Sequence, residues 1–178
     1  MMEGAMKQAL AGYFGRMRGG GGLPPRPSWS HVIWSLLGGG LAIAIISALT
    51  FATGKPWLMA PFGASCVLAF GLPDSPLAQP RSIIGGHLLS ALVGLVCLSA
   101  FGPQWWAMGL SVAGAIAVMQ LTGTTHAPAG ANPILVMNGA LGWGGLLTPV
   151  LAGSLVLVAC ALLFNNLAKG RSYPRYWL

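Results

Sequence analysis

Two short stretches of this chain are nearly the same stretch: Ala60-Pro61-Phe62-Gly63-Ala64-Ser65-Cys66-Val67-Leu68 and, 67 positions later, Ala127-Pro128-Ala129-Gly130-Ala131-Asn132-Pro133-Ile134-Leu135. Ala, Pro, Gly, Ala and Leu are identical at matching positions, and Ser65 aligns with Asn132. Each copy is an apolar segment interrupted by Pro and Gly. In membrane proteins, paired segments of this kind at corresponding positions of two halves point to a binding site.

The composition is that of an integral membrane protein. Hydrophobic residues make up 55% of the chain and charged residues 6%, whereas a soluble domain has about 25% charged residues. No Asp, Glu, Lys or Arg lies between Arg81 and Lys169, and that stretch is long enough for several crossings of about 20 residues each. Most of the net charge of +7 comes from the basic ends, so it does not indicate a nucleic-acid surface.

The charge distribution also predicts the domain organisation. We expect a basic tail with a Gly/Pro linker (1–30), a first membrane repeat (31–101), a second membrane repeat (104–168) and a basic tail (169–178). Positive residues beside membrane segments mark the cytoplasmic side. The expected location is therefore a bacterial inner membrane or its equivalent, crossed several times, with both termini in the cytoplasm.

The apolar pattern predicts an all-α membrane protein built as two long–broken–long repeats. Four full transmembrane helices are predicted at about 31–53, 82–101, 104–122 and 146–168, and two short Pro/Gly-broken segments at about 56–73 and 126–145. The two halves are inverted if each broken segment crosses the membrane and parallel if it re-enters. The position of Arg81 favours inversion, because it is then cytoplasmic.

Small residues four positions apart predict close helix packing in three of these spans. The triplets are Gly40/Ala44/Ala48, Gly86/Ser90/Gly94 and Gly109/Ala113/Ala117.

Neutral polar groups around the broken segments predict a binding site. A half-helix begins after each Pro, and a helix N-terminus offers free N–H groups that favour an anion. Ser65 and Asn132 add a hydroxyl and an amide, although both residue types also serve as helix caps. His87 and His126 are the histidines of the charge-free region and are candidates as donors or proton carriers, or as neutral hydrogen-bonded side chains. The predicted substrate-binding residues are Gly63, Ala64, Ser65, His87, Thr125, His126, Gly130, Ala131 and Asn132.

Asp74 and Arg81 flank a Pro-rich loop, where we expect either an ion pair that orders the loop or an entrance that attracts anions. Acidic residues number only two in the chain. Cation transporters and proton pumps commonly use carboxylates, so a neutral or anionic solute is favoured. No catalytic set, metal-ligand spacing or phosphate-binding Gly motif is present, and we expect neither an enzyme nor a cofactor or metal.

The motifs resemble those of the HPP family of integral membrane proteins. The likeness rests on the stretch 60–65, on Pro73-Asp74-Ser75-Pro76-Leu77-Ala78-Gln79-Pro80-Arg81 leading to Gly85-Gly86-His87, and on the stretch 122–131. Together it covers about residues 30–168. Ala127 stands where the His-Pro-Pro motif of the family has its first Pro, while His126 and Pro128 are kept. The resemblance implies four membrane-spanning helices and, because some members are implicated in nitrite transport, a small-anion transporter.

The expected function is thus a membrane transporter or channel for a small inorganic anion, with nitrite as the leading substrate. Helix N-termini and neutral polar groups of the two broken segments would bind it. The expected partners are the lipid bilayer, the anion and further copies of the chain, but no nucleic acid. The alternatives are a non-transporting membrane scaffold or sensor subunit, and an aquaporin-like pore for a neutral solute.

Overall fold

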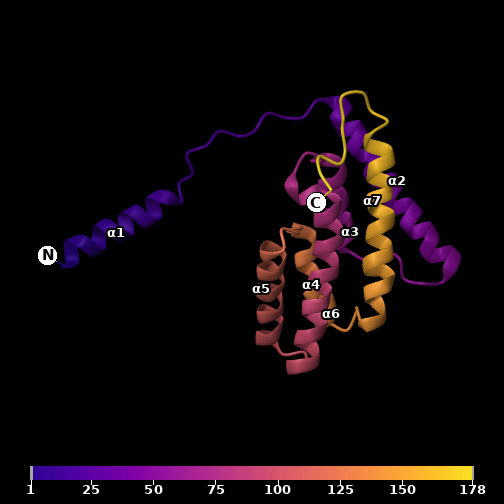
Figure 1. The fold of residues 1–178 in the computed structure, drawn as a ribbon. Helices are drawn as coiled ribbons and strands as arrows, with labels where there is room; N and C mark the ends of the chain where they lie inside the picture. The colour runs from indigo at the N-terminus through magenta and orange to yellow at the C-terminus, as the bar shows by residue number, and fades with distance from the viewer. Residues whose placement is uncertain (1, 178) are drawn as a thin grey trace.

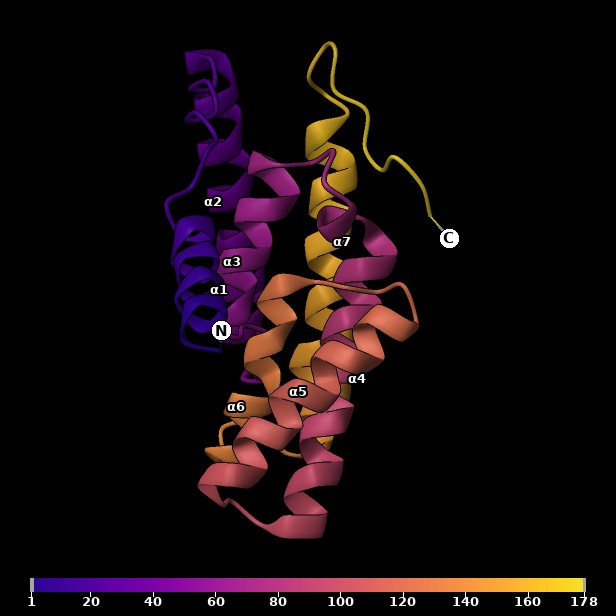
Figure 2. The ribbon, with the colours of Figure 1, turned by 90° about the vertical axis from the view of Figure 1, so that its left-hand side faces the viewer.

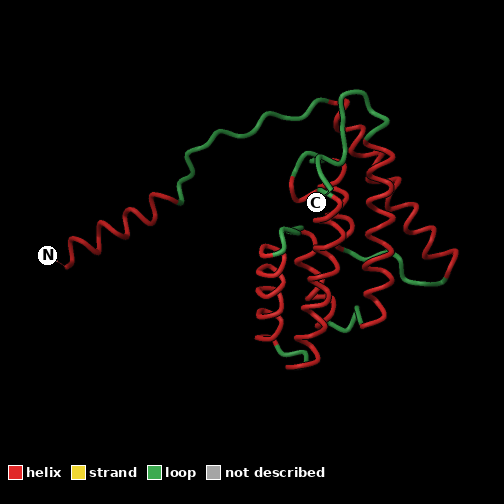
Figure 3. The backbone as a smooth tube through the Cα atoms, viewed as in Figure 1, coloured by secondary structure: helices red, strands yellow, loops and turns green. Residues whose placement is uncertain are grey.

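The computed structural model describes residues 2–177, and every regular element within them is helical (Figures 1 and 3). The predicted all-helical class is therefore confirmed. The α-helices are α1 (Met2–Arg16), α2 (Trp29–Thr53), α3 (Pro61–Cys66), α4 (Pro80–Phe101), α5 (Trp105–Leu121), α6 (Asn132–Met137) and α7 (Ala152–Asn165). Short 3-10 or π-helical pieces lie between them: η1 (Val67–Gly71), η2 (Pro76–Ala78), η3 (Ala127–Ala131), η4 (Trp143–Leu146) and η5 (Leu147–Leu151).

Local sequence accounts for where the long helices begin and end. The hydroxyl of Ser28 caps α2 by accepting the amide of His31, and Ser is a favoured N-cap residue. Gly54 ends α2 with a φ of 65°, which costs glycine no steric strain. Pro80 occupies the first turn of α4, where its missing N–H has no cost.

Three helical stretches of the described chain are long and apolar enough to cross a membrane: Trp29–Thr53, Pro80–Phe101 and Trp143–Asn165. They coincide with three of the four predicted spans. The fourth, α5, is a 17-residue helix that rises about 26 Å, somewhat less than the hydrocarbon thickness of about 30 Å.

The broken segments are short, as their Pro and Gly residues predict. The first is helical over Pro61–Gly71, which extends about 17 Å at 1.5 Å per residue. It begins as α3 and continues as the π-helical η1. The second begins as the 3-10 helix η3 and continues as α6. Because lipid cannot bond the backbone groups where a helix breaks, such segments need protein neighbours at membrane depth.

The two broken segments run in opposite directions. α2 and α3–η1 are antiparallel, since His31 bonds the carbonyl of Gly71 while Gly39, further along α2, faces Cys66. α4 and η3–α6 are parallel, because Gly86 faces His126 and Gly94 faces Pro133. The chain therefore passes down, up and down in its first half and up, down and up in its second (Figures 1 and 2). This is the inverted arrangement.

The halves also make the same contact twice. A Cβ on Gly86 would lie 2.8 Å from the carbonyl oxygen of Thr124, and a Cβ on Gly153 would lie 2.7 Å from that of Trp57. The two glycines are 67 positions apart, and so are the two carbonyls. Each half thus packs a long helix against the entry of the other half's broken segment, where only glycine fits.

The predicted small-residue packing holds for one triplet and is wrong for the other two. Gly86, Ser90 and Gly94 are buried on the face of α4 that meets η3–α6. The triplets of α2 and α5 lie instead on exposed faces, and a Cβ added at Gly40 or Gly109 would meet no atom within 4 Å. The buried positions of α2 and α5 are a different set: Gly38, Ala42, Ile46, Ala107, Ser111, Ala115 and Met119.

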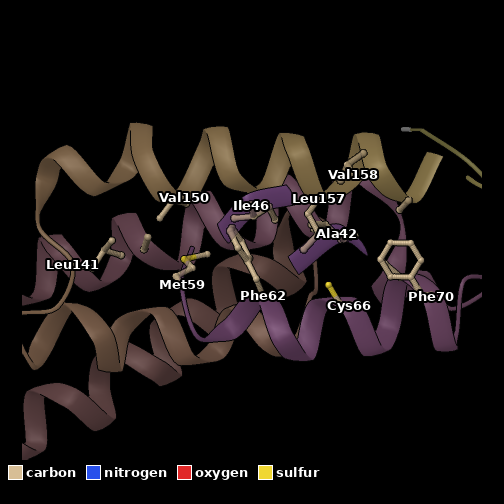
Figure 4. Close-up of a cluster of buried hydrophobic side chains, with 14 of the residues drawn as sticks. Ala42, Ile46, Met59, Phe62, Cys66, Phe70, Leu141, Val150, Leu157 and Val158 are labelled. Atoms are coloured by element: carbon tan, nitrogen blue, oxygen red, sulfur yellow. The ribbon is translucent and has the colours of Figure 1, made fainter. Parts of the chain in front are cut away.

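An apolar core fills the space between α2, α3–η1 and η5–α7. Phe62, Phe70 and Leu157 are fully buried there, and Figure 4 shows their neighbours from the three elements pointing inward. This core holds the first broken segment in place between two long helices.

The first and last long helices, and the tails attached to them, meet at one end of the bundle. The rings of Trp34, near the start of α2, and Phe164, near the end of α7, are 4.7 Å apart. The C-terminal tail then folds over the Pro-rich loop, where the hydroxyl of Tyr173 donates to the carbonyl of Ala78 at 2.7 Å. The linker before α2 joins the bundle at the same end, and α1 lies apart from the bundle (Figure 1).

Candidate functional site

Four of the predicted site residues form one hydrogen-bonded cluster, the Ser–His–His–Asn cluster. Ser65 comes from α3, His87 from α4, His126 from the chain just before η3, and Asn132 from the start of α6. All four side chains have 0% exposure. The two broken segments therefore meet at these side chains, with α4 between them.

The direction of the bonds at His126 follows from its partners. Its Nδ1 lies 2.7 Å from the carbonyl oxygen of Leu77, which only accepts hydrogen bonds, so Nδ1 carries the hydrogen. In the neutral ring Nε2 is then an acceptor, and it lies 2.8 Å from Oγ of Ser65. The hydroxyl of Ser65 therefore donates to His126.

The direction at His87 is set by Asn132. The amide nitrogen Nδ2 of Asn132 donates to the carbonyl oxygen of His87 at 2.9 Å and to its ring Nδ1 at 3.1 Å. Since Nδ1 accepts, the neutral ring carries its hydrogen on Nε2. That nitrogen lies 2.9 Å from Oγ of Ser65 and donates to it. The cluster is thus one directed chain, from Asn132 through His87, Ser65 and His126 to the carbonyl of Leu77.

One polar atom of the cluster has no partner. The side-chain oxygen Oδ1 of Asn132 is buried and forms no hydrogen bond. A buried polar atom left unpaired costs about 1–3 kcal/mol, and such atoms in native proteins call for an explanation such as a bound water or ligand. The cluster therefore offers a free acceptor at this point.

Packing holds the two imidazole rings in place. The ring of Phe62 meets that of His87 edge-on, with centroids 5.2 Å apart, and the two histidine rings are 4.9 Å apart. One turn further along α4, Ser90 donates to the carbonyl of Ala129 at 2.6 Å and ties α4 to the chain after His126.

The other predicted site residues lie outside the cluster. Gly63 and Ala64 are exposed, while Thr125, Gly130 and Ala131 are half-buried. The amide groups at the start of α3 are occupied as well, because those of Phe62 and Gly63 donate to carbonyls of the preceding turn. The donors of the site are therefore side chains, and the expectation that the start of α3 supplies free N–H groups is corrected.

The predicted ion pair between Asp74 and Arg81 is wrong. Asp74 pairs with Arg175 of the C-terminal tail, whose Nε lies 2.6 Å from its Oδ1. This hydrogen bond raises the pKa of Arg175 above its ordinary value. Arg81 instead donates from Nη2 to the carbonyl of Thr122 at 3.0 Å, so it closes over the loop that leads to His126.

Comparison with known proteins identifies the family. The family model described as "HPP, transmembrane region" matches residues 24–174. The chain belongs to the HPP family. Two relatives from Dictyostelium discoideum, both described as transmembrane proteins, are each 36% identical to it, over 186 and 177 residues. The alignments cover 97% and 93% of this chain but only 65% and 57% of the relatives, so the chain spans about three fifths of their length. No solved structure matches.

The Ser–His–His–Asn cluster has a cavity on one side and the contact of Arg81 with Thr122 on the other. A cavity of about 660 Å³ is lined by residues that include Met59, Leu135 and Thr148. It lies at the end of the bundle opposite to the C-terminal tail. Phe62, one turn along the chain from Met59 (Figure 4), packs edge-on against the ring of His87. On the other side of His87 along α4, Arg81 and Thr122 are in contact.

Sequence reasoning missed the backbone partners of the Ser–His–His–Asn cluster. The carbonyl of Leu77 orients His126, and that of Pro61 lies 3.2 Å from Oγ of Ser65 as a second possible acceptor, but no residue type marks a carbonyl as a site group. It also missed His31, whose ring bonds Gly71 and Arg171. Within residues 2–177 no group of three or more His, Cys, Asp or Glu side chains is placed to hold a metal ion.

Proposed function

We propose that this HPP family member is a transporter or channel that carries a small inorganic anion across the membrane, with nitrite as the leading substrate. The observation that carries the proposal is the buried Ser–His–His–Asn cluster, which joins both broken segments inside an apolar bundle. Polar and ionisable side chains are costly at membrane depth, and there they mark functional sites. The resemblance to family members implicated in nitrite transport supports the choice of substrate.

The balance of charges supports an anion over a cation. The chain has two acidic residues, of which Asp74 is exposed and paired with Arg175. The cluster itself contains hydroxyl, imidazole and amide groups and no carboxylate. Such groups donate hydrogen bonds to an anion once their internal bonds open, whereas a cation would find little compensating charge.

The proposal includes a topology. The four long elements and the two broken segments cross the membrane in series as inverted repeats, with both basic tails on the cytoplasmic side. The cavity near Met59 then opens toward the opposite side, and Arg81 lies on the route to the cytoplasm. Because the broken segments need shielding, several copies of the chain assemble in the membrane.

Nitrite uptake into proteoliposomes tests this function. We expect uptake above that of empty liposomes, and its loss in Asn132→Leu and His126→Ala. Ser154→Ala is the matched control: Ser154 aligns with His87 in the repeat and is buried, but its hydroxyl bonds Leu151 outside the cluster.

The outcomes separate the alternatives. Uptake equal to that of empty liposomes across a panel of small anions would overturn transport and favour a scaffold or sensor. Passage of neutral solutes alone would favour an aquaporin-like pore. Uptake that survives both substitutions would leave transport standing and remove the cluster as its site.

A further inference from the structure

We propose that His126 is a proton-binding site that takes up one proton with each anion, so that proton and anion cross the membrane as a neutral unit. The inference rests on the proposed function for its anion. The choice of His126 as the proton site follows from the hydrogen-bond geometry of the cluster alone.

His126 can take a proton while every bond of its ring is kept. The proton forms a new N–H bond at Nε2, which then donates to Oγ of Ser65 across the same 2.8 Å. Nδ1–H continues to donate to Leu77. The ring loses no partner and gains a positive charge.

Ser65 makes this change with a rotation of its hydroxyl group. The carbonyl oxygen of Pro61 lies 3.2 Å from Oγ of Ser65 and accepts the hydrogen that previously pointed at His126. Oγ then accepts one bond from each histidine, which matches the two acceptor positions of a hydroxyl oxygen. Pro61 thus serves as the alternative acceptor that the second protonation state requires.

His87 has no equivalent freedom. Its Nε2 already carries a hydrogen, and its Nδ1 faces the amide nitrogen of Asn132 at 3.1 Å. That nitrogen cannot be exchanged with Oδ1 by turning the amide, because it also donates to the carbonyl oxygen of His87. A proton on Nδ1 would bring two donors together. The geometry therefore assigns the proton to His126 and makes His87 a neutral donor.

The surrounding charges couple this proton to an anion. Two ionisable groups of α4 lie near His126: His87, which is neutral, and Arg81. The guanidinium of Arg81 bonds Thr122, in the loop that leads to His126. Cys66 of α3 packs toward Gly39 of α2. Asp74, in the loop before α4, is paired with Arg175. A buried imidazolium without a counter-charge is costly, and so is a buried anion. Each compensates the other when they enter together.

The first test measures protons at binding. Nitrite is added to the detergent-purified protein in weakly buffered solution, and a pH indicator follows the release or uptake of protons. We expect about one proton taken up per bound nitrite in the wild type and in His31→Gln, the matched control. We expect none in His126→Gln, whose side chain keeps a hydrogen-bonding group but binds no proton. Nitrite binding without proton uptake in the wild type would overturn the proposal.

The second test measures transport. In proteoliposomes we expect an inward proton gradient to raise nitrite uptake at least tenfold, and a membrane potential set with K⁺ and valinomycin to leave it unchanged. Empty liposomes account for nitrous acid that crosses the lipid unaided. Uptake driven by the potential would overturn proton coupling while leaving anion transport intact. Wild-type protein that shows no uptake at all would instead overturn the proposed function.

Discussion

At the scale of single residues, backbone carbonyls decide what the polar side chains do. Leu77 and His87 each present a carbonyl oxygen to one neighbour, and these two oxygens orient the ring of His126 and the amide of Asn132. The two histidines consequently carry their hydrogens on different nitrogens, although both are neutral imidazoles. Their opposite tautomers give the chain of hydrogen bonds its direction.

Asn132→Leu is therefore expected to lower stability as well as uptake. The substitution leaves Nδ1 of His87 unpaired inside the bundle, which costs about 1–3 kcal/mol. Thermal unfolding in detergent measures the loss. Asn138→Leu, at an exposed position of the same segment, is expected to stay within about 0.5 kcal/mol of the wild type. Equal stability of the two variants would contradict the assigned bonds.

At the scale of elements, glycines decide which helices approach closely. Gly86 of α4 and Gly153 of α7 each lie against a carbonyl of the other half. Helix association within lipid depends on such close packing because no hydrophobic effect drives it. The exposed glycines of α2 and α5 have no such neighbours within the chain.

Gly86→Ala and Gly153→Ala are both expected to destabilise the bundle. The added methyl group forces two backbones apart, and overpacking of this kind costs about 1–3 kcal/mol. Gly40→Ala and Gly109→Ala are the matched controls in exposed helix positions, where alanine is favoured over glycine by about 0.5–1 kcal/mol. Unfolding midpoints that fall equally in all four variants would contradict the packing.

One buried hydroxyl is among the groups that hold the C-terminal tail to the Pro-rich loop, together with two bonds from Arg175 to Gln79 and Asp74. Tyr173 has 2% exposure, and burial raises the pKa of its hydroxyl above the ordinary value. The hydroxyl therefore stays neutral and donates to Ala78 at every pH below the ordinary tyrosine pKa of about 10. The stability that it contributes is lost only as the pH rises beyond that value.

Tyr173→Phe is expected to loosen the tail. Loss of one buried hydrogen bond costs about 1 kcal/mol, which corresponds to a roughly fivefold larger open population. Trypsin cleavage after Arg171, followed by mass spectrometry, is expected to accelerate by about that factor. Tyr176→Phe, at an exposed position, provides the control. Identical cleavage in both variants would show that other contacts anchor the tail.

At the scale of the whole molecule, the inverted halves place two surfaces on opposite sides. Ser75 lies in the loop that the C-terminal tail covers, whereas Leu135 lines the cavity at the other end of the bundle. In a chain without its native cysteines, Ser75→Cys is expected to react with a membrane-impermeant thiol reagent from the side of the termini. Leu135→Cys is expected to react from the opposite side. Labelling of both from one side would support parallel, re-entrant repeats.

Much of the fold could be predicted from the sequence because the membrane imposes simple rules. Apolar runs of sufficient length predict helices, and Pro and Gly predict where they break. The repeat predicted that Ser65 and Asn132 occupy equivalent places, and both lie in the cluster with His87 and His126. The same motif also predicts Gly63 and Gly130 as site residues, but Gly63 is exposed and Gly130 only half-buried, because nearby residues of a helix point to different sides.

Composition and local backbone preference are enough to predict the helical class, the broken segments and the four polar side chains of the cluster. Helix packing, by contrast, brings His87 between Ser65 and Asn132, pairs Asp74 with Arg175 and sets the two broken segments in opposite directions. These features join residues tens of positions apart. Their geometry depends on how whole helices pack, which no local stretch of sequence encodes.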